Sequence, residues 1–354
     1  MTKAELDSIK ILPLEDSWYR KVKEKLDGIA KPLDGLGKFE HLIAQIGAIE
    51  KTTKISIQKK AVLVMCADNG VVEEQVSQSG KEVTLAVAKA MGVNNSSVGK
   101  MAAVAGVDVI PVDIGIDTDE VIPGVLPRKV AKGTKNFAKE PAMTEEEVLK
   151  AIETGIQLVQ QCHREGYEIL ATGEMGIGNT TTSTAVAAAL LDLEVEQETG
   201  KGAGLTDEAL KRKCRVIEEA IEKYSLRDAD AFTILKTVGG LDIAGLTGVF
   251  IGAAIEQIPV VIDGVISAVA ALLAETLCKG AVNYMIPSHK SRELAETAIM
   301  KKLHLDPVLD ADMALGEGTG AVMMMSLLDV ALGVYLQGAS FANFEIEQYK
   351  RYEE

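Results

Sequence analysis

The apolar residues of the chain recur in five short runs, and longer segments with helical patterns separate these runs. The runs lack the strict alternation of a half-exposed strand, so each predicts a strand that is buried on both faces. Strands that alternate with helices are typical of a parallel sheet covered by helices on both sides. We therefore predict an α/β fold with a mostly parallel sheet and strands at residues 61–67, 107–112, 167–172, 260–262 and 281–286.

Two of the expected helices carry start signals. Thr144 and Glu147 form a capping-box pattern, and Thr206 precedes two acidic residues at the start of a charged amphipathic stretch. Residues 243–258 and 267–278 are almost wholly small or apolar, which predicts tightly packed or interface helices.

The two ends of the chain are helical in pattern as well. We predict that residues 1–30 and 326–354 pair as a small helical domain. This domain would lie beside a large α/β catalytic domain that spans residues 31–325.

Polar side chains follow the predicted strands at the points where the strands end. Ligands of open α/β sheets bind beyond the carboxyl ends of the strands, so these residues predict one functional rim. They are Asp68, Asn69, Asp113, Glu174, Asp263 and Ser288.

Residues 173–182, G-E-M-G-I-G-N-T-T-T, form a glycine-rich turn between a predicted strand and an alanine-rich helix. Gly176 and Gly178 allow backbone N–H groups to converge, and Asn179 and Thr180 add donors at a helix N-terminus, which favours a phosphate site. The alternative is that a strand-to-helix turn needs glycine for its geometry alone. Four successive polar side chains have no packing purpose there, so we favour phosphate binding.

Two glutamates are the candidate reactive groups. Glu317 lies between glycines in the loop L-G-E-G-T-G-A at residues 315–321, where it is either a ligand-facing carboxylate or a solvated turn residue. Glu174 stands beside the phosphate cradle, a place that suits a carboxylate in contact with a sugar hydroxyl or a developing cation. Lys213 either serves the same ligand or belongs to a solvated basic face.

Composition narrows the classes of function. The 354 residues are 47% hydrophobic and 25% charged, as in a globular enzyme, and the net charge of −15 argues against nucleic acid or an acidic membrane as a partner. The start of the chain has no apolar signal core, so we expect a cytoplasmic protein. The four cysteines contain no C-x-x-C pair and predict reduced thiols rather than a metal site; they are Cys66, Cys162, Cys214 and Cys278.

Eight blocks, in order and at plausible spacings, resemble the nicotinate-nucleotide–dimethylbenzimidazole phosphoribosyltransferase family. The most distinctive are E-M-G-I-G-N-T-T and G-E-G-T-G, and both are intact. The resemblance runs from about residue 31 to residue 330. The blocks are residues 31–40, 67–77, 112–116, 173–182, 237–246, 263–268, 288–292 and 315–321.

The resemblance implies transfer of phosphoribose from nicotinate mononucleotide to a lower-ligand base, a step of cobalamin assembly, by a Rossmann-like homodimer without a cofactor or a metal. It implies that Glu317 is the catalytic base and that Glu174 contacts the ribose region. The phosphate would be held by residues 176–180 together with Lys213 and Ser291. The implied substrate-binding set is Gly176, Ile177, Gly178, Asn179, Thr180, Gly202, Ala203, Gly204, Lys213, Ser291, Leu315 and Gly316.

The chain departs from the family near the expected base pocket. Members commonly have A-D-H-G where this chain has Asn69, Pro-Gln where it has Gly80 and Lys81, and a glutamine within the segment that corresponds to residues 83–90. These differences leave other benzimidazoles, purines and phenolics open as acceptors. A partner-dependent or non-catalytic nucleotide-binding subunit is the alternative from a different class of protein.

Overall fold

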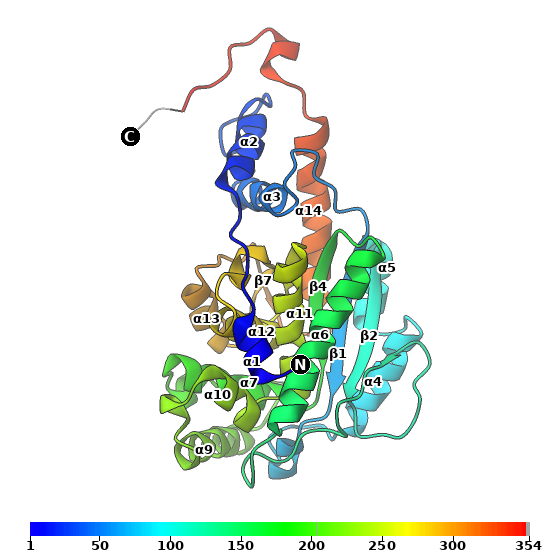
Figure 1. Cartoon of the computed structure of the whole chain (residues 1–354), viewed down its shortest axis with the longest axis vertical. Coiled ribbons are helices and arrows are strands. Elements are labelled where there is room, and N and C mark those ends of the chain that lie inside the picture. The colour runs from blue at the N-terminus through cyan, green and yellow to red at the C-terminus, as the bar shows by residue number, and fades with distance from the viewer. Residues whose placement is uncertain (203, 352–354) are drawn as a thin grey trace.

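A six-stranded parallel sheet forms the centre of the molecule, with the order β3-β2-β1-β4-β5-β6 (Figure 1). The computed structural model describes residues 1–202 and 204–351. The predicted α/β fold with a mostly parallel sheet is confirmed. The strands are β1 (Lys60–Ala67), β2 (Val107–Gly115), β3 (Leu126–Pro127), β4 (Ile169–Met175), β5 (Val260–Ile262) and β6 (Met285–Pro287).

Helices cover both faces of this sheet. The helices of the described residues, including those that pack only on other helices, are α1 (Lys3–Ser8), α2 (Asp16–Asp27), α3 (Lys38–Ile49), α4 (Glu82–Gly92), α5 (Ser97–Ala105), α6 (Glu145–Arg164), α7 (Asn179–Leu191), α8 (Val195–Glu198), α9 (Asp207–Lys223), α10 (Ala231–Val238), α11 (Leu241–Glu256), α12 (Val265–Leu277), α13 (Ala295–Leu303) and α14 (Thr319–Gln337).

Strand β1 shows why the apolar runs lack alternation. Leu63 and Met65 pack with α6, α7, α11 and α12 on one face, while Val62 and Val64 pack with α3, α5 and α14 on the other. Every residue of β1 is buried. Because both faces are covered, a polar side chain is unfavourable whichever face of the sheet it points to.

The predicted helix starts are confirmed. Thr144 and Glu147 make the reciprocal bonds of a capping box at α6, and the Thr206 side chain accepts the Ala209 N–H at the start of α9. The predicted apolar helices correspond to α11 and α12, and the residues of α11 are buried over nearly its whole length.

One predicted strand is wrong in its first half. The residues of Ala281–Tyr284 form a 3-10 turn, and only the residues after it enter the sheet as β6. Gly280 has a φ of 99° there, and the Glu275 carboxylate accepts the N–H groups of Gly280 and Val282. These bonds hold the backbone in a turn, which the apolar composition of the segment does not reveal.

A second, two-stranded sheet was not predicted. Strands β7 (His289–Ser291) and β8 (Leu309–Met313) pair in parallel away from the main sheet. The residues of β8 are mostly exposed and alternate between polar and apolar, so the segment does not read as a buried run. This small sheet leads directly into the loop that carries Glu317.

Helix α14 is, within residues 1–202 and 204–351, the one helix long and apolar enough in length and composition to cross a membrane. Its side chains Met324, Met325 and Leu328 are buried against the sheet face that carries Val62. Packing of this kind is typical of a core helix in a protein with a large hydrophobic core.

The segments near the two ends of the chain meet at one end of the molecule. Helix α2 packs on α3, both lie beside the outer end of α14, and Ile29 forms a β-bridge with Ser340 (Figure 1). We propose that these segments form the small helical domain beside the large domain. Helix α1 packs elsewhere, because the Met1 amino group pairs with Glu153 on α6 at 2.7 Å.

Candidate active site

A pocket of about 200 Å³ opens at the carboxyl ends of β4 and β5. The strand register aligns these ends, since Met65 of β1 pairs with Glu174 of β4, and Ala171 of β4 pairs with Val261 of β5. The pocket brings together ten of the predicted catalytic and substrate-binding residues. They are Glu174, Gly176, Ile177, Asn179, Thr180, Gly202, Ser291, Leu315, Gly316 and Glu317.

The remaining candidate residues that the structure describes do not line the pocket. Gly178 is the left-handed residue before α7, and Gly204 belongs to the turn that follows Gly202. Ala203 lies outside the described residues. The rim residue Asp113 pairs with Lys129 at 2.8 Å and takes no part in the pocket lining.

The first glycine loop connects β4 to α7 over residues 176–178. A Cβ atom on Gly176 would lie 2.6 Å from the Ala67 carbonyl oxygen and 2.7 Å from the Asp242 carboxylate. The Ile177 N–H donates to the Thr84 hydroxyl at 3.2 Å. The loop is therefore held close to the sheet, and Gly176 is required there because a side chain has no space.

Lys213 stands behind the first glycine loop and is fully buried. Its ammonium group donates to the Thr180 hydroxyl at 2.9 Å and to the Gly200 carbonyl at 3.1 Å. Burial lowers the pKa of Lys213 to about 8. The interpretation of this lysine as part of a solvated basic face is wrong, and a cation supports the loop from inside the protein.

Glu174 belongs to a buried polar cluster. The Asn179 amide donates to the Glu174 carboxylate and, at 3.1 Å, to the Asp242 carboxylate. Burial, with the negative charges of Asp242, Asp263 and Glu317 nearby, raises the pKa of Glu174 to about 8. Glu174 therefore holds a proton at neutral pH in the absence of a ligand, and a positive charge in the pocket would favour its ionised form.

Glu317 is presented by a strained loop. It has a φ of 61° between Gly316 and Gly318, which also have positive φ values of 82° and 90°. Its carboxylate accepts the Val98 N–H at 3.0 Å, at the N-terminus of α5. Burial raises the pKa of Glu317, while this backbone hydrogen bond partly opposes the increase. The half-buried, bonded carboxylate excludes the interpretation of Glu317 as a solvated turn residue.

Three further polar residues of this region were not among the predicted catalytic and substrate-binding residues, although Asp263 belonged to the predicted functional rim. Asp263 and His289 line the pocket, and Asp242 bonds to Asn179 behind it. Asp263 carried one signal, its position directly after a buried strand. Asp242 lies within an apolar helix, and His289 lies in a strand that was not predicted, so the signal for each was its place in a block of the family resemblance.

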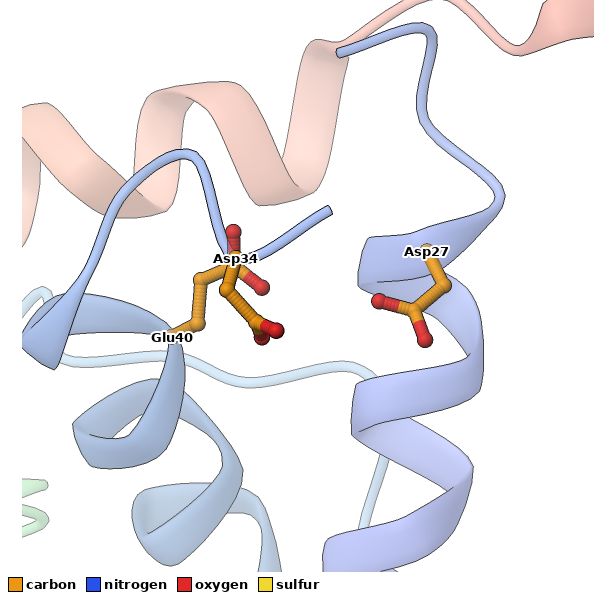
Figure 2. A group of neighbouring side chains, drawn as sticks. All are labelled: Asp27, Asp34 and Glu40. Carbon is orange, nitrogen blue, oxygen red and sulfur yellow. The ribbon is translucent and has the colours of Figure 1, made fainter. Parts of the chain in front are cut away.

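A group of three carboxylates with metal-like spacing lies away from the pocket (Figure 2). Asp27, Asp34 and Glu40 come from α2, the following loop and α3, and their neighbours already neutralise them. Lys23 bonds to Glu40 at 2.8 Å, and Arg351 bonds to Asp27 and Asp34 at 2.7 Å each. The cluster is thus an ion-pair network that ties the C-terminal tail to the small helical region.

Comparisons with known proteins show the family of the chain. A family model described as phosphoribosyltransferase matches residues 11–346. A nicotinate-nucleotide–dimethylbenzimidazole phosphoribosyltransferase from Clostridium acetobutylicum is 43% identical over 337 residues, covering 95% of this chain and 96% of that protein. One from Acetivibrio thermocellus is 45% identical over 329 residues, covering 93% and 94%. The crystal structure of CobT from Thermus thermophilus has a TM-score of 0.89 at 33% identity and covers 94% of this chain and 100% of that one.

Proposed function

The chain belongs to the nicotinate-nucleotide–dimethylbenzimidazole phosphoribosyltransferase family, and we propose that it transfers phosphoribose from nicotinate mononucleotide to 5,6-dimethylbenzimidazole or a related base. The products are nicotinate and α-ribazole 5′-phosphate, for the nucleotide loop of a cobalamin. The observation that carries this proposal is one pocket lined by the glycine loop in front of buried Lys213 and by Glu317. A cytoplasmic location fits the four free cysteines.

The first glycine loop binds the phosphate in this proposal. Asn179 and Thr180 at the start of α7 line the pocket, and the ammonium of Lys213 lies 2.9 Å from the Thr180 hydroxyl. A helix N-terminus backed by a buried cation attracts an anion even in a protein of net charge −15. Ser291, on the opposite wall of the pocket, supplies a further hydroxyl.

The chemistry of transfer needs one base. The pyridinium of nicotinate mononucleotide is already cationic, so its departure needs no general acid and leaves positive charge on the ribose. The attacking base loses its N–H proton as its other nitrogen bonds to the anomeric carbon, and the Glu317 carboxylate accepts that proton. Attack opposite the leaving group inverts the configuration from β to α.

Glu174 stabilises the ribose in this proposal. Its carboxyl holds a proton in the empty pocket because burial and three nearby carboxylates raise its pKa to about 8. The cationic pyridinium of the bound nucleotide favours the ionised carboxylate, which releases its proton to solvent on binding and then stabilises the positive charge that develops on the ribose. Asn179 keeps this carboxylate in place through its amide.

The acceptor is the open part of the proposal. Asn69 lies beneath the first glycine loop, where its amide donates to the Ile177 carbonyl at 3.5 Å. Lys81 precedes α4 and pairs with Asp117. Since the chain differs from its family at these positions, purines and phenolics stand beside benzimidazoles as candidate acceptors, and a phenolic acceptor would give an oxygen glycoside.

A homodimer is proposed as the working assembly. Apolar side chains are exposed on α5 and α14, two helices that pack together: Val104 is 92% exposed and Val330 is 74% exposed. Exposed apolar residues of this size are typical of interfaces. The molar mass in solution, from light scattering of the wild type and of Val330→Glu, tests this. A dimeric wild type and a monomeric variant are expected, and a monomeric wild type would contradict the proposal.

The function is tested with the purified chain, nicotinate mononucleotide and a panel of benzimidazoles, purines and phenols. We expect nicotinate release that depends on the acceptor, and a product whose mass and anomeric configuration identify an α-riboside phosphate. Nucleotide binding without release for every acceptor would contradict an independent enzyme and favour the subunit alternative. Base-dependent turnover without nicotinate release would indicate a different glycosyl-transferring enzyme.

A further inference from the structure

Asp263 follows β5 and makes a set of contacts that link the sheet to the loop of Glu317. Its two carboxylate oxygens accept the N–H groups of Gly318 at 3.1 Å, Gly320 at 2.9 Å and Ala321 at 3.1 Å. These are among the N–H groups that a helix leaves unpaired at its start. Gly318 has no side chain to cap α14, so the cap comes from a residue 55 positions earlier in the chain.

The loop needs such an anchor because its backbone is strained. Gly316, Glu317 and Gly318 all have positive φ values, and the left-handed region is unfavourable for a non-glycine residue such as Glu317. The loop also lies directly on β4, since a Cβ atom on Gly173 would be 2.6 Å from the Glu317 carbonyl oxygen. Hydrogen bonds from residues outside the loop are needed to hold this strained backbone in place.

We propose that Asp263 is the positioning residue for Glu317, holding the loop main chain so that this carboxylate faces the acceptor base. The inference rests on the function proposed above. The main chain of the loop is held by Asp263, and the side chain of Glu317 is held by the Val98 N–H. With both held, the remaining freedom of the carboxylate is small, as a base that must meet one proton requires.

The negative charge of Asp263 also favours the function of Glu317 as a base. His289, Glu174, Glu296 and Glu317 are the titratable groups that interact with Asp263 from the surrounding elements. Burial raises the pKa of Asp263, while His289 and the amides of α14 favour its ionised form. Its negative charge raises the pKa of Glu317, which makes Glu317 a stronger base.

Asp263→Asn tests the inference, because the amide keeps the shape but loses the charge and places an NH₂ group against backbone donors. We expect kcat to fall about tenfold or more with the KM for nicotinate mononucleotide within about threefold. The acidic limb of kcat against pH should move to lower pH, because Glu317 and Glu174 both lose a negative neighbour. An unchanged kcat, or a fall in kcat with an unmoved limb, would overturn the inference.

Asp263→Glu separates geometry from charge. It keeps the carboxylate but lengthens the side chain by one methylene, so kcat should fall while the acidic limb stays in place. The matched control is Asp113→Asn, another buried carboxyl at a strand end, which bonds to Lys129 outside the pocket. The control should retain kcat within about twofold, and an equal loss in the control would overturn a specific role for Asp263.

Amide hydrogen exchange tests the anchor independently of activity. In the wild type the amides of Gly318, Gly320 and Ala321 should be protected, and Asp263→Asn should raise their exchange rates about tenfold or more relative to amides of β1. Unchanged protection would overturn the inference. Because exchange needs no turnover, an inactive wild type would contradict the proposed function while leaving this result to decide the role of Asp263.

Discussion

The two glycine-rich loops of the pocket are similar in sequence. They differ in whether the N–H groups at the start of the helix that follows already have a hydrogen-bond acceptor within the protein. Within residues 1–202 and 204–351, no protein acceptor takes the N–H groups of Gly178 and Thr180 at the start of α7. At the start of α14, the N–H groups of Gly318 and its neighbours are already bound by Asp263. One helix start is open to a ligand, and the other is closed by the protein itself.

The charges behind the two loops follow the same division. A buried cation, Lys213, stands behind the first loop, and a buried carboxylate, Asp263, stands behind the second. An anion is attracted to the first loop and repelled from the second, since Coulomb interactions are strong where water is excluded. A G-x-G pattern before a helix therefore does not determine phosphate binding, because the group that faces the helix start decides it.

The largest effect expected is on the second loop. Glu317→Gln should lower kcat about a hundredfold or more, since the amide cannot accept the proton, with the affinity for nicotinate mononucleotide nearly unchanged. Steady-state kinetics and calorimetric titration with the nucleotide measure the two quantities. Turnover at the wild-type rate would contradict the assignment of Glu317 as the base. It would also contradict the assignment of the chemical step to the second loop.

The first loop should respond in binding instead. Gly176→Val should weaken the affinity for nicotinate mononucleotide about tenfold or more, because the new side chain would collide with the Ala67 carbonyl and the Asp242 carboxylate. Gly333→Val is the matched control, since a Cβ atom on Gly333 meets nothing within 4 Å. Equal affinities for the two variants would show that the first loop does not bind the phosphate.

A smaller effect is expected from pH. Lys213 has a lowered pKa of about 8, so its ammonium is charged below that pH and becomes neutral as the pH rises through it. The affinity for nicotinate mononucleotide should fall between about pH 7 and pH 9, by about tenfold. Lys213→Met should bind weakly throughout that range without this fall, whereas Lys211→Met, on the exposed face of α9, should behave as the wild type. If the affinity of Lys213→Met still falls with rising pH, the pH dependence belongs to another group.

The smallest effect is expected outside both loops. Arg351→Ala removes the ion pairs to Asp27 and Asp34, two of the three carboxylates drawn in Figure 2. Because these groups are partly exposed, the free energy of unfolding should fall by at most about 1 kcal/mol, with kcat unchanged. Chemical denaturation and kinetics measure both. A loss of activity would show that the small helical region takes part in the chemistry.

Much of the fold was predictable from the chain. The runs at residues 61–67, 107–112 and 260–262 are strands of the sheet, because complete burial on both faces leaves an uninterrupted apolar pattern. Residues 281–284 were wrongly predicted because they are apolar but form a turn. Strand β8 was missed because it is mostly exposed and therefore has no uninterrupted apolar pattern.

The chain by itself determined most of the buried strands of the main sheet, the helix caps at Thr144 and Thr206, the glycine loops and the presence of Glu174, Lys213 and Glu317, because these depend on local backbone preferences and on residue type. Only the tertiary structure decided that Lys213 is buried behind Thr180 and that Asp263 caps a helix 55 positions away. Such contacts join residues that are distant in sequence, so their existence depends on how the sheet and helices pack. The chemical difference between the two glycine loops is a property of that packing.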